Sequence, residues 1–340
     1  DLATALCDLH PWADMVRYAR TGGEAMAVAV RIARAQTGKD IVLFCGYHGW
    51  HDWYLSANLA DDRSLDGHLL PGLNPRGVPR ALKGTAFPFN YNDTKSFIEA
   101  VEKNRDQIGA IVLESIRNSF PEKGFIERVR QVASEIGSVL IVDEISAGWR
   151  LNLGGAHLVL GIDPDIAVFA KGMSNGFPMA AIIGKHEVME AAQDTFISST
   201  YWTDRLGPVA ALATIQKMRQ EKVPEHLDLI GVNIRQGWAR LAQKHDLNIA
   251  VSGINPMSHF IFQYQDSLVL KTLFTQLMLE RGFLASTSFY ASFAHKESHV
   301  KNYLDAVDDV FGILVRWIRE GNPELNLKGR VCHTGFKRLT

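Results

Sequence analysis

Short runs of apolar residues alternate with Ala-rich or amphipathic stretches through roughly the first 200 residues of the chain. The runs contain no polar position, so the strands they predict are buried on both faces. The stretches between them carry apolar residues at helical spacing. This alternation predicts an α/β layer architecture, in which helices cover both faces of a parallel sheet. The expected strands are residues 41–45, 110–113, 139–142, 166–169 and 181–183, and the expected helices are residues 22–37 and 126–135.

The pattern changes at about Asp204, where long helical stretches replace the short alternating elements. A brief strand-like run at residues 260–262 interrupts them. This change predicts a large domain over residues 1–222 and a small C-terminal α+β domain over residues 223–340. The helices expected from Asp204 onward are residues 204–221, which link the two domains, and residues 224–245, 267–281 and 297–320.

One long stretch, residues 56–85, shows no sustained period and is rich in Gly, Pro, Asp and Asn. A long irregular connection in a compact domain is usually a lid, a binding loop or disordered. This segment is our candidate for a lid.

The charge balance limits the class of partner. The chain has 36 basic and 37 acidic side chains, a net charge of -1, which argues against nucleic-acid and acidic-membrane partners. Cys7, Cys45 and Cys332 are far apart, which argues against a disulfide framework or a zinc site. No apolar run approaches the length of a membrane span. We expect a cytoplasmic protein without a bound metal.

Polar residues directly follow three of the predicted strands. Glu114, Asp143 and Lys171 each stand at the carboxyl end of an apolar run, which is the edge where ligands bind in parallel sheets. A lysine beside an apolar strand end can act as a Schiff-base nucleophile. The alternative is a salt bridge between Lys171 and Asp143 at the rim of the sheet. A serine hydrolase is not supported, because Ser146 has no histidine in a nucleophile-elbow setting.

A possible phosphate cradle stands at the start of the helix over residues 22–37. The sequence Thr21-Gly22-Gly23-Glu24 allows close backbone approach, and a helix N-terminus offers free N–H groups to an anion. An N-cap turn explains the same residues when they are taken alone. Phosphate cradle, lysine and carboxylate together are the components of a pyridoxal-phosphate (PLP) site.

Taken in chain order, these motifs resemble the class III (fold-type I) aminotransferases, most closely the branch that contains glutamate-semialdehyde aminomutase. The similarity runs from about residue 12 to about residue 315. Residues 21–25 stand where the family has S-G-T-E-A, and residues 47–49 match its Y-H-G. Residues 143–150 match D-E-V-x-x-G-F-R, and Lys171-Gly172 matches the Schiff-base lysine. Residues 154–156, 163–165 and 199–201 also follow this branch.

The resemblance implies the PLP-dependent transferase fold type I, with a mostly parallel central sheet, and a role for each matched position. The backbone of Gly22 and Gly23 would bind the phosphate, Tyr47 and Ile145 would lie on the two faces of the cofactor ring, and Asp143 would bind the pyridine nitrogen. Thr200 would reach the cofactor phosphate of the neighbouring subunit in a homodimer. The implied catalytic residues are Lys171 and Asp143, and the implied cofactor-binding residues are Thr21, Gly22, Gly23, Tyr47, His48, Glu114, Asp143, Ile145, Lys171 and Thr200.

The chain departs from the family pattern at several positions. Ser115 replaces a Pro, Gly23 replaces a Thr of the phosphate cradle, and Tyr290 stands where the aminomutase has a Glu. The family's N-terminal segment, which helps wall the substrate pocket, has no counterpart before Asp1. We expect part of the substrate pocket to lie outside this chain.

These observations predict an aminotransferase that moves an amino group between an amine or amino acid and a carbonyl substrate through a Lys171 aldimine. Its partners would be a small amino donor and a small carbonyl acceptor. Two alternatives remain. One is a glutamate-1-semialdehyde 2,1-aminomutase-type isomerase, against which Tyr290 counts. The other is a catalytically idle PLP-fold protein or a fragment.

Overall fold

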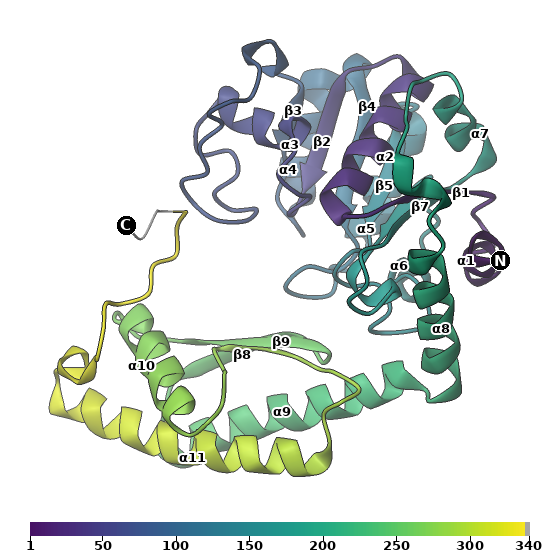
Figure 1. Cartoon of the computed structure of the whole chain (residues 1–340). Coiled ribbons are helices and arrows are strands. Elements are labelled where there is room, and N and C mark those ends of the chain that lie inside the picture. Colours follow the sequence, from purple (N-terminus) through teal and green to yellow (C-terminus); the bar gives the residue numbers. More distant parts are fainter. Residues whose placement is uncertain (337–340) are drawn as a thin grey trace. The chain divides into compact units, whose positions relative to one another are not determined.

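The computed structural model describes residues 1–336, and the chain divides into two compact units (Figure 1). The larger unit comprises residues 1–117 and 121–221 with Gly335 and Phe336, and the smaller comprises residues 118–120 and 222–334. The larger unit is built on a mostly parallel sheet and the smaller on a separate antiparallel sheet. This arrangement confirms the predicted α/β fold class.

The sheet of the larger unit has seven strands in the order β1-β7-β6-β5-β4-β2-β3. Strands β2 to β6 run parallel to one another, and β7 is antiparallel to both of its neighbours, β6 and β1. Six strands therefore share one direction, and the expectation of a parallel strand at residues 181–183 was wrong. The strands are β1 Met15–Ala19, β2 Ile41–Cys45, β3 Ala86–Pro88, β4 Ile108–Glu114, β5 Val139–Asp143, β6 Ile166–Phe169 and β7 Ala180–Gly184.

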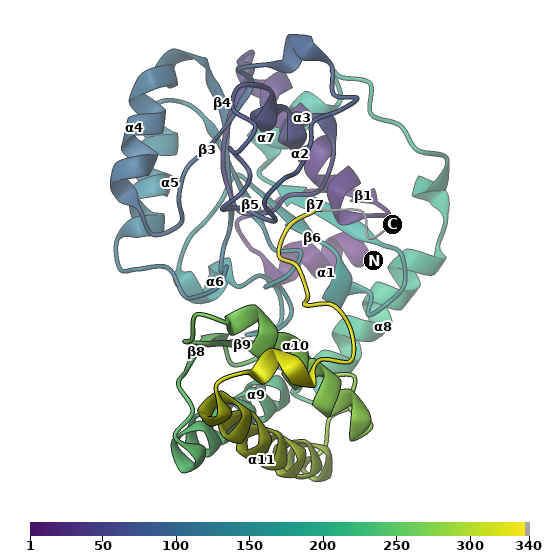
Figure 2. The same ribbon diagram turned by 90° about the vertical axis from the view of Figure 1, so that its left-hand side faces the viewer.

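Two separate apolar cores explain why the runs at residues 41–45, 110–113 and 139–142 have no polar position. Alternate residues of one strand enter opposite cores, as Phe44 and Leu43 of β2 do. Helix α2 covers one face, and α4 and α5 cover the other (Figure 2). The helices of this unit are α1 Leu2–Leu9, α2 Gly22–Thr37, α3 Asp52–Leu55, α4 Thr94–Asn104, α5 Phe125–Glu135, α6 His157–Leu160, α7 His186–Met189 and α8 Leu206–Gln220.

Helix α2 has a recognisable cap at each end. The Thr21 hydroxyl accepts a hydrogen bond from the Glu24 amide, and the Glu24 carboxylate accepts one in return from the Thr21 amide. This capping box satisfies donors that a helix start otherwise leaves unpaired. Gly38, at φ 65°, ends the helix in the left-handed conformation.

The segment over residues 56–85 is anchored to the sheet. It contains two short 3₁₀ turns, Ser56–Leu59 and Arg80–Leu82. Arg117, three residues beyond the end of β4, donates hydrogen bonds to the carbonyl oxygens of Gly67 and His68 at 3.0 and 2.6 Å. The His68 Nδ1 atom accepts a hydrogen bond from the Gly46 amide at 3.2 Å. Burial lowers the pKa of His68 to about 4, so the ring is neutral and keeps this acceptor.

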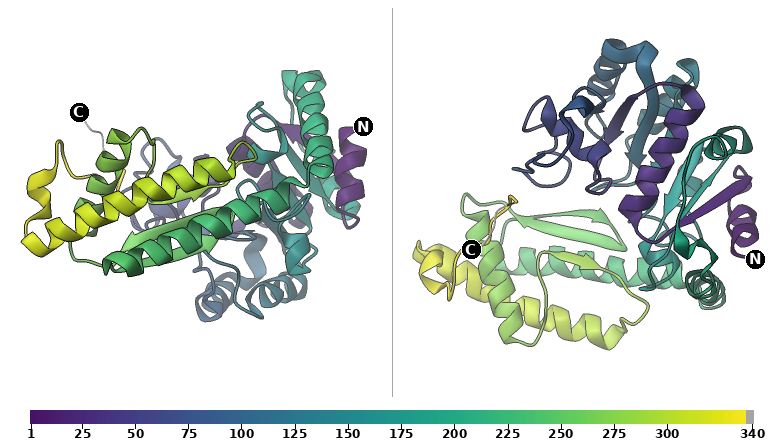
Figure 3. Two further views of the ribbon diagram at one scale, coloured as in Figure 1. Left: turned by 90° about the horizontal axis from the view of Figure 1, so that it is seen from below. Right: turned by 45° about the horizontal axis from the view of Figure 1, so that its top comes forward.

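The smaller unit packs long helices against a three-stranded antiparallel sheet of order β10-β9-β8. Helices α9 and α11 lie side by side (Figure 3). The aromatic core contains Trp238, Phe260, Phe274 and Phe311. The strand expected at residues 260–262 is the end of β9. The elements are α9 Val223–His245, β8 Ile249–Ile254, β9 Met257–Phe262, α10 Ser267–Glu280, β10 Ser288–Tyr290, α11 Glu297–Glu320 and a 3₁₀ turn Pro323–Asn326.

None of the helices within residues 1–336 has both the length and the apolar character that crossing a bilayer requires.

Candidate active site

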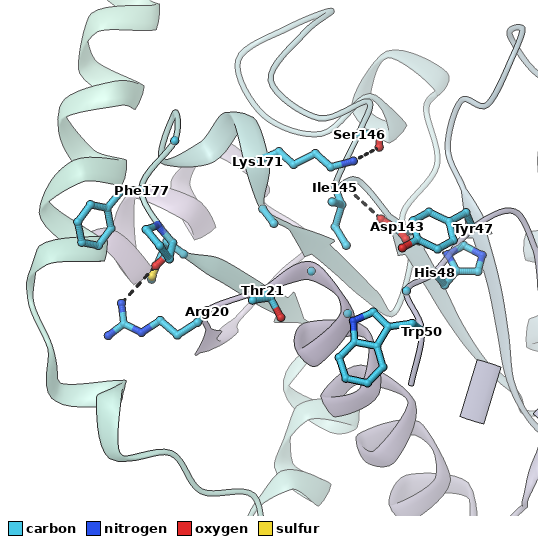
Figure 4. A pocket seen from close by; sticks show the side chains of 17 residues that line it. Arg20, Thr21, Tyr47, His48, Trp50, Asp143, Ile145, Ser146, Lys171 and Phe177 are labelled. Atoms are coloured by element: carbon cyan, nitrogen blue, oxygen red, sulfur yellow. Dashed lines mark hydrogen bonds and ion pairs between the residues drawn. The ribbon is translucent and has the colours of Figure 1, made fainter. Parts of the chain in front are cut away.

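A cavity of about 500 Å³ opens at the carboxyl edge of the large sheet (Figure 4). Its walls come from the segments that follow β1, β2, β5 and β6, which all point their ends to this edge. The topology therefore brings together side chains that are more than 100 residues apart in the sequence. Among the predicted site residues, the cavity is lined by Thr21, Gly22, Gly23, Tyr47, His48, Asp143, Ile145 and Lys171.

Asp143, the last residue of β5, is held by two N–H groups. Its Oδ2 atom lies 2.8 Å from Nδ1 of His48, and its Oδ1 atom accepts a hydrogen bond from the Ile145 amide at 2.9 Å. The other ring nitrogen of His48 lies 3.1 Å from the carbonyl oxygen of Cys45. Both side chains are buried. These contacts fix the carboxylate in one orientation at the cavity wall, and they show His48 as a partner of Asp143.

Lys171 follows β6 and extends its amine into the cavity. Its Nζ atom donates a hydrogen bond to the Ser146 hydroxyl at 2.7 Å (Figure 4). Asp143 is paired with His48 instead, so the salt bridge between Lys171 and Asp143 is not formed. The Lys171 backbone has φ 43°, in the left-handed region that non-glycine residues rarely adopt. Such outliers are common at functional sites.

The first turn of α2 provides two free amides to the cavity. The capping box occupies the amides of Thr21 and Glu24, and the Arg20 amide donates to the Glu24 carboxylate at 2.8 Å. The amides of Gly22 and Gly23 belong to the turn for which a helix has no carbonyl acceptor. They are therefore available to an anion, which the helix N-terminus also favours electrostatically.

Glycines let three segments meet beside this turn. A Cβ atom on Gly22 would lie 2.8 Å from Cδ1 of Ile145, and one on Gly23 would lie 3.2 Å from the His51 ring. A Cβ atom on Gly49 would lie 2.9 Å from Cα of Gly23. A side chain at position 23, where the family has a threonine, would therefore crowd the His51 ring.

Glu114 lies behind the cavity and does not line it. Its Oε2 atom accepts a hydrogen bond from the Tyr47 amide at 3.3 Å and lies 4.0 Å from the Arg117 guanidinium. Burial raises the pKa of Glu114 above its usual range, although the nearby His48 opposes this shift. Through its hydrogen bond with the Tyr47 amide, the Glu114 carboxyl supports the turn that carries Tyr47.

Thr200 and the segment over residues 56–85 also lie outside the cavity lining. Thr200 begins a 3₁₀ turn, Thr200–Thr203, and is exposed. No contact to the cavity supports the expectation that residues 56–85 act as a lid.

Several lining residues were missed by the sequence reasoning, among them Arg20, Ser146 and Phe177. Arg20 is ion-paired with Asp204 at 2.9 Å and donates to the carbonyl oxygen of Pro178 at 3.3 Å. Its position directly before Thr21 was an available signal. Ser146 stands three residues after Asp143, and only the structure shows its hydroxyl beside Lys171.

A second buried network, on the far side of Asp143, holds the loop that carries Ile145 and Ser146. The Glu144 Oε1 atom accepts hydrogen bonds from the amide and from Nδ1 of His157, each at 2.8 Å. Nε2 of His157 accepts one from the Trp12 indole at 3.0 Å. A Cβ atom on Gly154 would lie 2.9 Å from the His10 ring, and so the glycines of this loop follow from its packing.

The sequence pattern of the family described as "Aminotransferase class-III" matches residues 1–288. The chain belongs to the class III aminotransferases. These are PLP-dependent enzymes that transfer an amino group between small molecules.

Curated relatives of this aminotransferase include enzymes of two kinds. It is 29% identical over 321 residues to a 3-aminobutyryl-CoA aminotransferase of Cloacimonas acidaminovorans, covering 90% of this chain and 73% of the relative. It is also 29% identical over 334 residues to a glutamate-1-semialdehyde 2,1-aminomutase of Persephonella marina, covering 92% and 77%. In fold the chain is similar to the PLP internal aldimine form of the FumI protein of Sphingopyxis sp. MTA144, with a TM-score of 0.85. The two are 24% identical, and the match covers 95% of this chain and 77% of the FumI chain.

The residues of the cavity fit PLP. The cofactor needs an amine for attachment, a carboxylate for its pyridine nitrogen and an anion site for its phosphate. The cavity contains one group of each kind: the Lys171 amine, the Asp143 carboxylate, and the amides of Gly22 and Gly23 at a helix N-terminus. A side chain at Gly22 would collide with Ile145, so the space beside this wall depends on glycine.

We expect Gly49→Ala to weaken PLP binding about tenfold or more. The added methyl group would lie 2.9 Å from Cα of Gly23 on a backbone with φ 98°, and strain of this kind costs about 1–3 kcal/mol, where about 1.4 kcal/mol is tenfold in affinity. Calorimetric titration of the cofactor-free protein measures the effect. Gly67→Ala is the matched control, because its Cβ would meet no heavy atom within 4 Å. Equal affinities for the two variants would contradict the close approach.

Proposed function

We propose that Lys171 carries PLP and moves the proton of an amino-group transfer, while Asp143 and the first turn of α2 hold the cofactor. One observation carries this proposal: a single cavity contains the Lys171 amine, a carboxylate fixed by two N–H donors and two free helix amides. The three groups come from three separate elements of the sheet edge, and no one of them would indicate a PLP site alone.

Each residue has a defined task in this proposal. When bound, PLP draws electron density from the carbon that loses a proton. The Lys171 Nζ atom would take that proton from the substrate carbon and deliver it to the C4′ atom of the cofactor. Asp143 would accept a hydrogen bond from the pyridine N–H and so keep that nitrogen protonated. Tyr47 and Ile145 would restrain the ring, and the Gly22 and Gly23 amides would bind the phosphate.

Lys171→Ala is expected to remove turnover and covalent attachment of PLP, since no other amine would occupy this place. Loss of a positioned acid or base costs about 10²–10⁴-fold in rate. Asp143→Ala is expected to lose most of the activity while PLP still attaches to Lys171. Absorbance spectra and steady-state assays with amino donors and carbonyl acceptors measure both effects. Full activity in either variant would remove that residue from its assigned role.

The aminomutase relative at 29% identity supports a second candidate function, an intramolecular shift of the amino group. The first candidate requires a separate carbonyl acceptor, and the second does not. Turnover measured with and without an added 2-oxo acid separates them. We expect dependence on the acceptor, because Tyr290 replaces the acidic residue of the aminomutase segment. Isomerisation without an acceptor would establish the second function.

We also propose that two copies of the chain pair through the face that carries Trp50, Phe196, Tyr201, Leu206 and Val209. These large apolar side chains are between 61% and 85% exposed and all belong to the larger unit. Exposed apolar patches are a feature of protein interfaces. Four of the five side chains belong to residues 196–209, and Thr200 lies in the same stretch of the chain, exposed and outside the cavity of its own chain. In this dimer Thr200 would complete the phosphate site of the partner.

Mixing two inactive variants tests the shared site. A dimer of one Lys171→Ala chain and one Thr200→Ala chain would contain one site with both residues intact. Random pairing of equal amounts would restore about a quarter of the wild-type sites, because half of the dimers are mixed and each has one complete site. Activity is measured after dissociation and reassociation of the mixture. Activity no greater than the mean of the separate variants would overturn the shared site.

A further inference from the structure

The Ser146 hydroxyl is the hydrogen-bond partner of the Lys171 amine. The Oγ and Nζ atoms lie 2.7 Å apart, and both residues line the cavity (Figure 4). Ser146 belongs to the loop after β5 and Lys171 to the segment after β6. The contact therefore crosses from one strand end to the next.

The backbone that carries Ser146 is held from several directions. Its carbonyl oxygen accepts a hydrogen bond from Nε of Arg150 at 2.7 Å, and the preceding amide of Ile145 donates to Asp143. The Gly148 amide donates to the carbonyl oxygen of Glu144 at 2.9 Å, which closes the turn. The hydroxyl thus projects from a fixed turn, as a positioning group requires.

The backbone of Lys171 is equally constrained. The Asn175 amide donates to the Lys171 carbonyl oxygen at 3.1 Å, and the Met173 amide donates to that of Ala170 at 3.0 Å. The long side chain nevertheless has four rotatable bonds, whose freedom the backbone does not restrict. A partner at the tip of the side chain is needed to place Nζ.

A hydroxyl such as that of Ser146 can pair with either protonation state of an amine. An ammonium group can only donate hydrogen bonds, whereas a neutral amine can also accept one. A hydroxyl accepts from the first and donates to the second, so it keeps the contact in both protonation states. A carboxylate would favour the ammonium form alone. Asp143, the carboxylate of this wall, is engaged by His48 instead.

We propose that Ser146 is a positioning residue that holds the Lys171 amine in place whether or not the amine carries a proton. This proposal rests on the role of Lys171 proposed above. A proton carrier must change protonation without leaving its position, and misplacement by about 1 Å can cost about 100-fold in rate. The serine hydroxyl meets this requirement at the observed distance.

The test compares Ser146→Ala with Ser146→Thr, which keeps the hydroxyl. In Ser146→Ala we expect the rate constant for covalent attachment of PLP to the cofactor-free protein to fall about tenfold, measured by stopped-flow absorbance. We also expect kcat to fall about tenfold with KM within about twofold, and a larger isotope effect with substrate deuterated at the reacting carbon. Ser146→Thr should restore all three values. Ser134→Ala, at an exposed position of helix α5, is the matched control.

Two outcomes overturn the proposal. One is an attachment rate and isotope effect in Ser146→Ala equal to those of the wild type. The other is a Ser146→Thr variant as slow as Ser146→Ala, since the hydroxyl would then be irrelevant. The thermal unfolding midpoint of each variant shows that it is folded. Failure of the Lys171 proposal is distinguishable, because covalent attachment of PLP would then persist in Lys171→Ala.

Discussion

The hydrogen bond between Asp143 and His48 is the contact on which the site depends, because it joins the end of β5 to the turn after β2. That turn continues into Gly49, which approaches Gly23 of α2, and Gly22 in turn meets Ile145 in the loop after β5. The contacts thus form a closed ring around the cavity wall. Because every member is held from two sides, the carboxylate and the anion-binding amides keep a fixed relation to each other, and little ordering remains to oppose cofactor binding.

Asp143 and Glu144 are adjacent buried acidic residues with different partners. Asp143 faces the cavity, and Glu144 faces away toward His157. The Glu144 network orients the loop that carries Ile145 and Ser146 without touching the cavity. This division explains why adjacent carboxylates in one motif have different tasks. One lines the cavity, and the other fixes the loop that shapes the cavity wall.

Much of the fold follows from the pattern of apolar residues, but strand direction does not. The five buried strands were predicted because their runs are continuously apolar, and alternate residues of β2, β4 and β5 enter opposite cores, as Phe44 and Leu43 show. The reversal of β7 was not predicted, since an apolar run reads the same in both directions. Strand β3 was not predicted, because a strand of three residues has no periodic signal, and helix α4 was missed although Phe97 and Val101 are buried at helical spacing. Strand β8 was missed although its first three residues, 249–251, form an apolar run as long as residues 260–262.

Some features of the site could likewise be predicted from the sequence, and others could not. Residues at strand ends, such as Asp143 and Lys171, could be placed at one edge from topology alone. Side-chain partners could not, because they depend on rotamers and on loops with no periodic signal. His48 was expected to bind the cofactor, and it lines the cavity with its ring 2.8 Å from Asp143. Ser146 was considered only as a nucleophile, and its hydroxyl is the hydrogen-bond partner of Lys171.

Attachment of PLP is where these contacts can be examined most directly. The holoenzyme is reduced with borohydride, digested with a protease and analysed by mass spectrometry. We predict that the mass of the reduced cofactor is found on the peptide containing Lys171 and on no other lysine. A cofactor mass on a different lysine, or none on a protein that turns over amino donors, would contradict the assignment of this cavity.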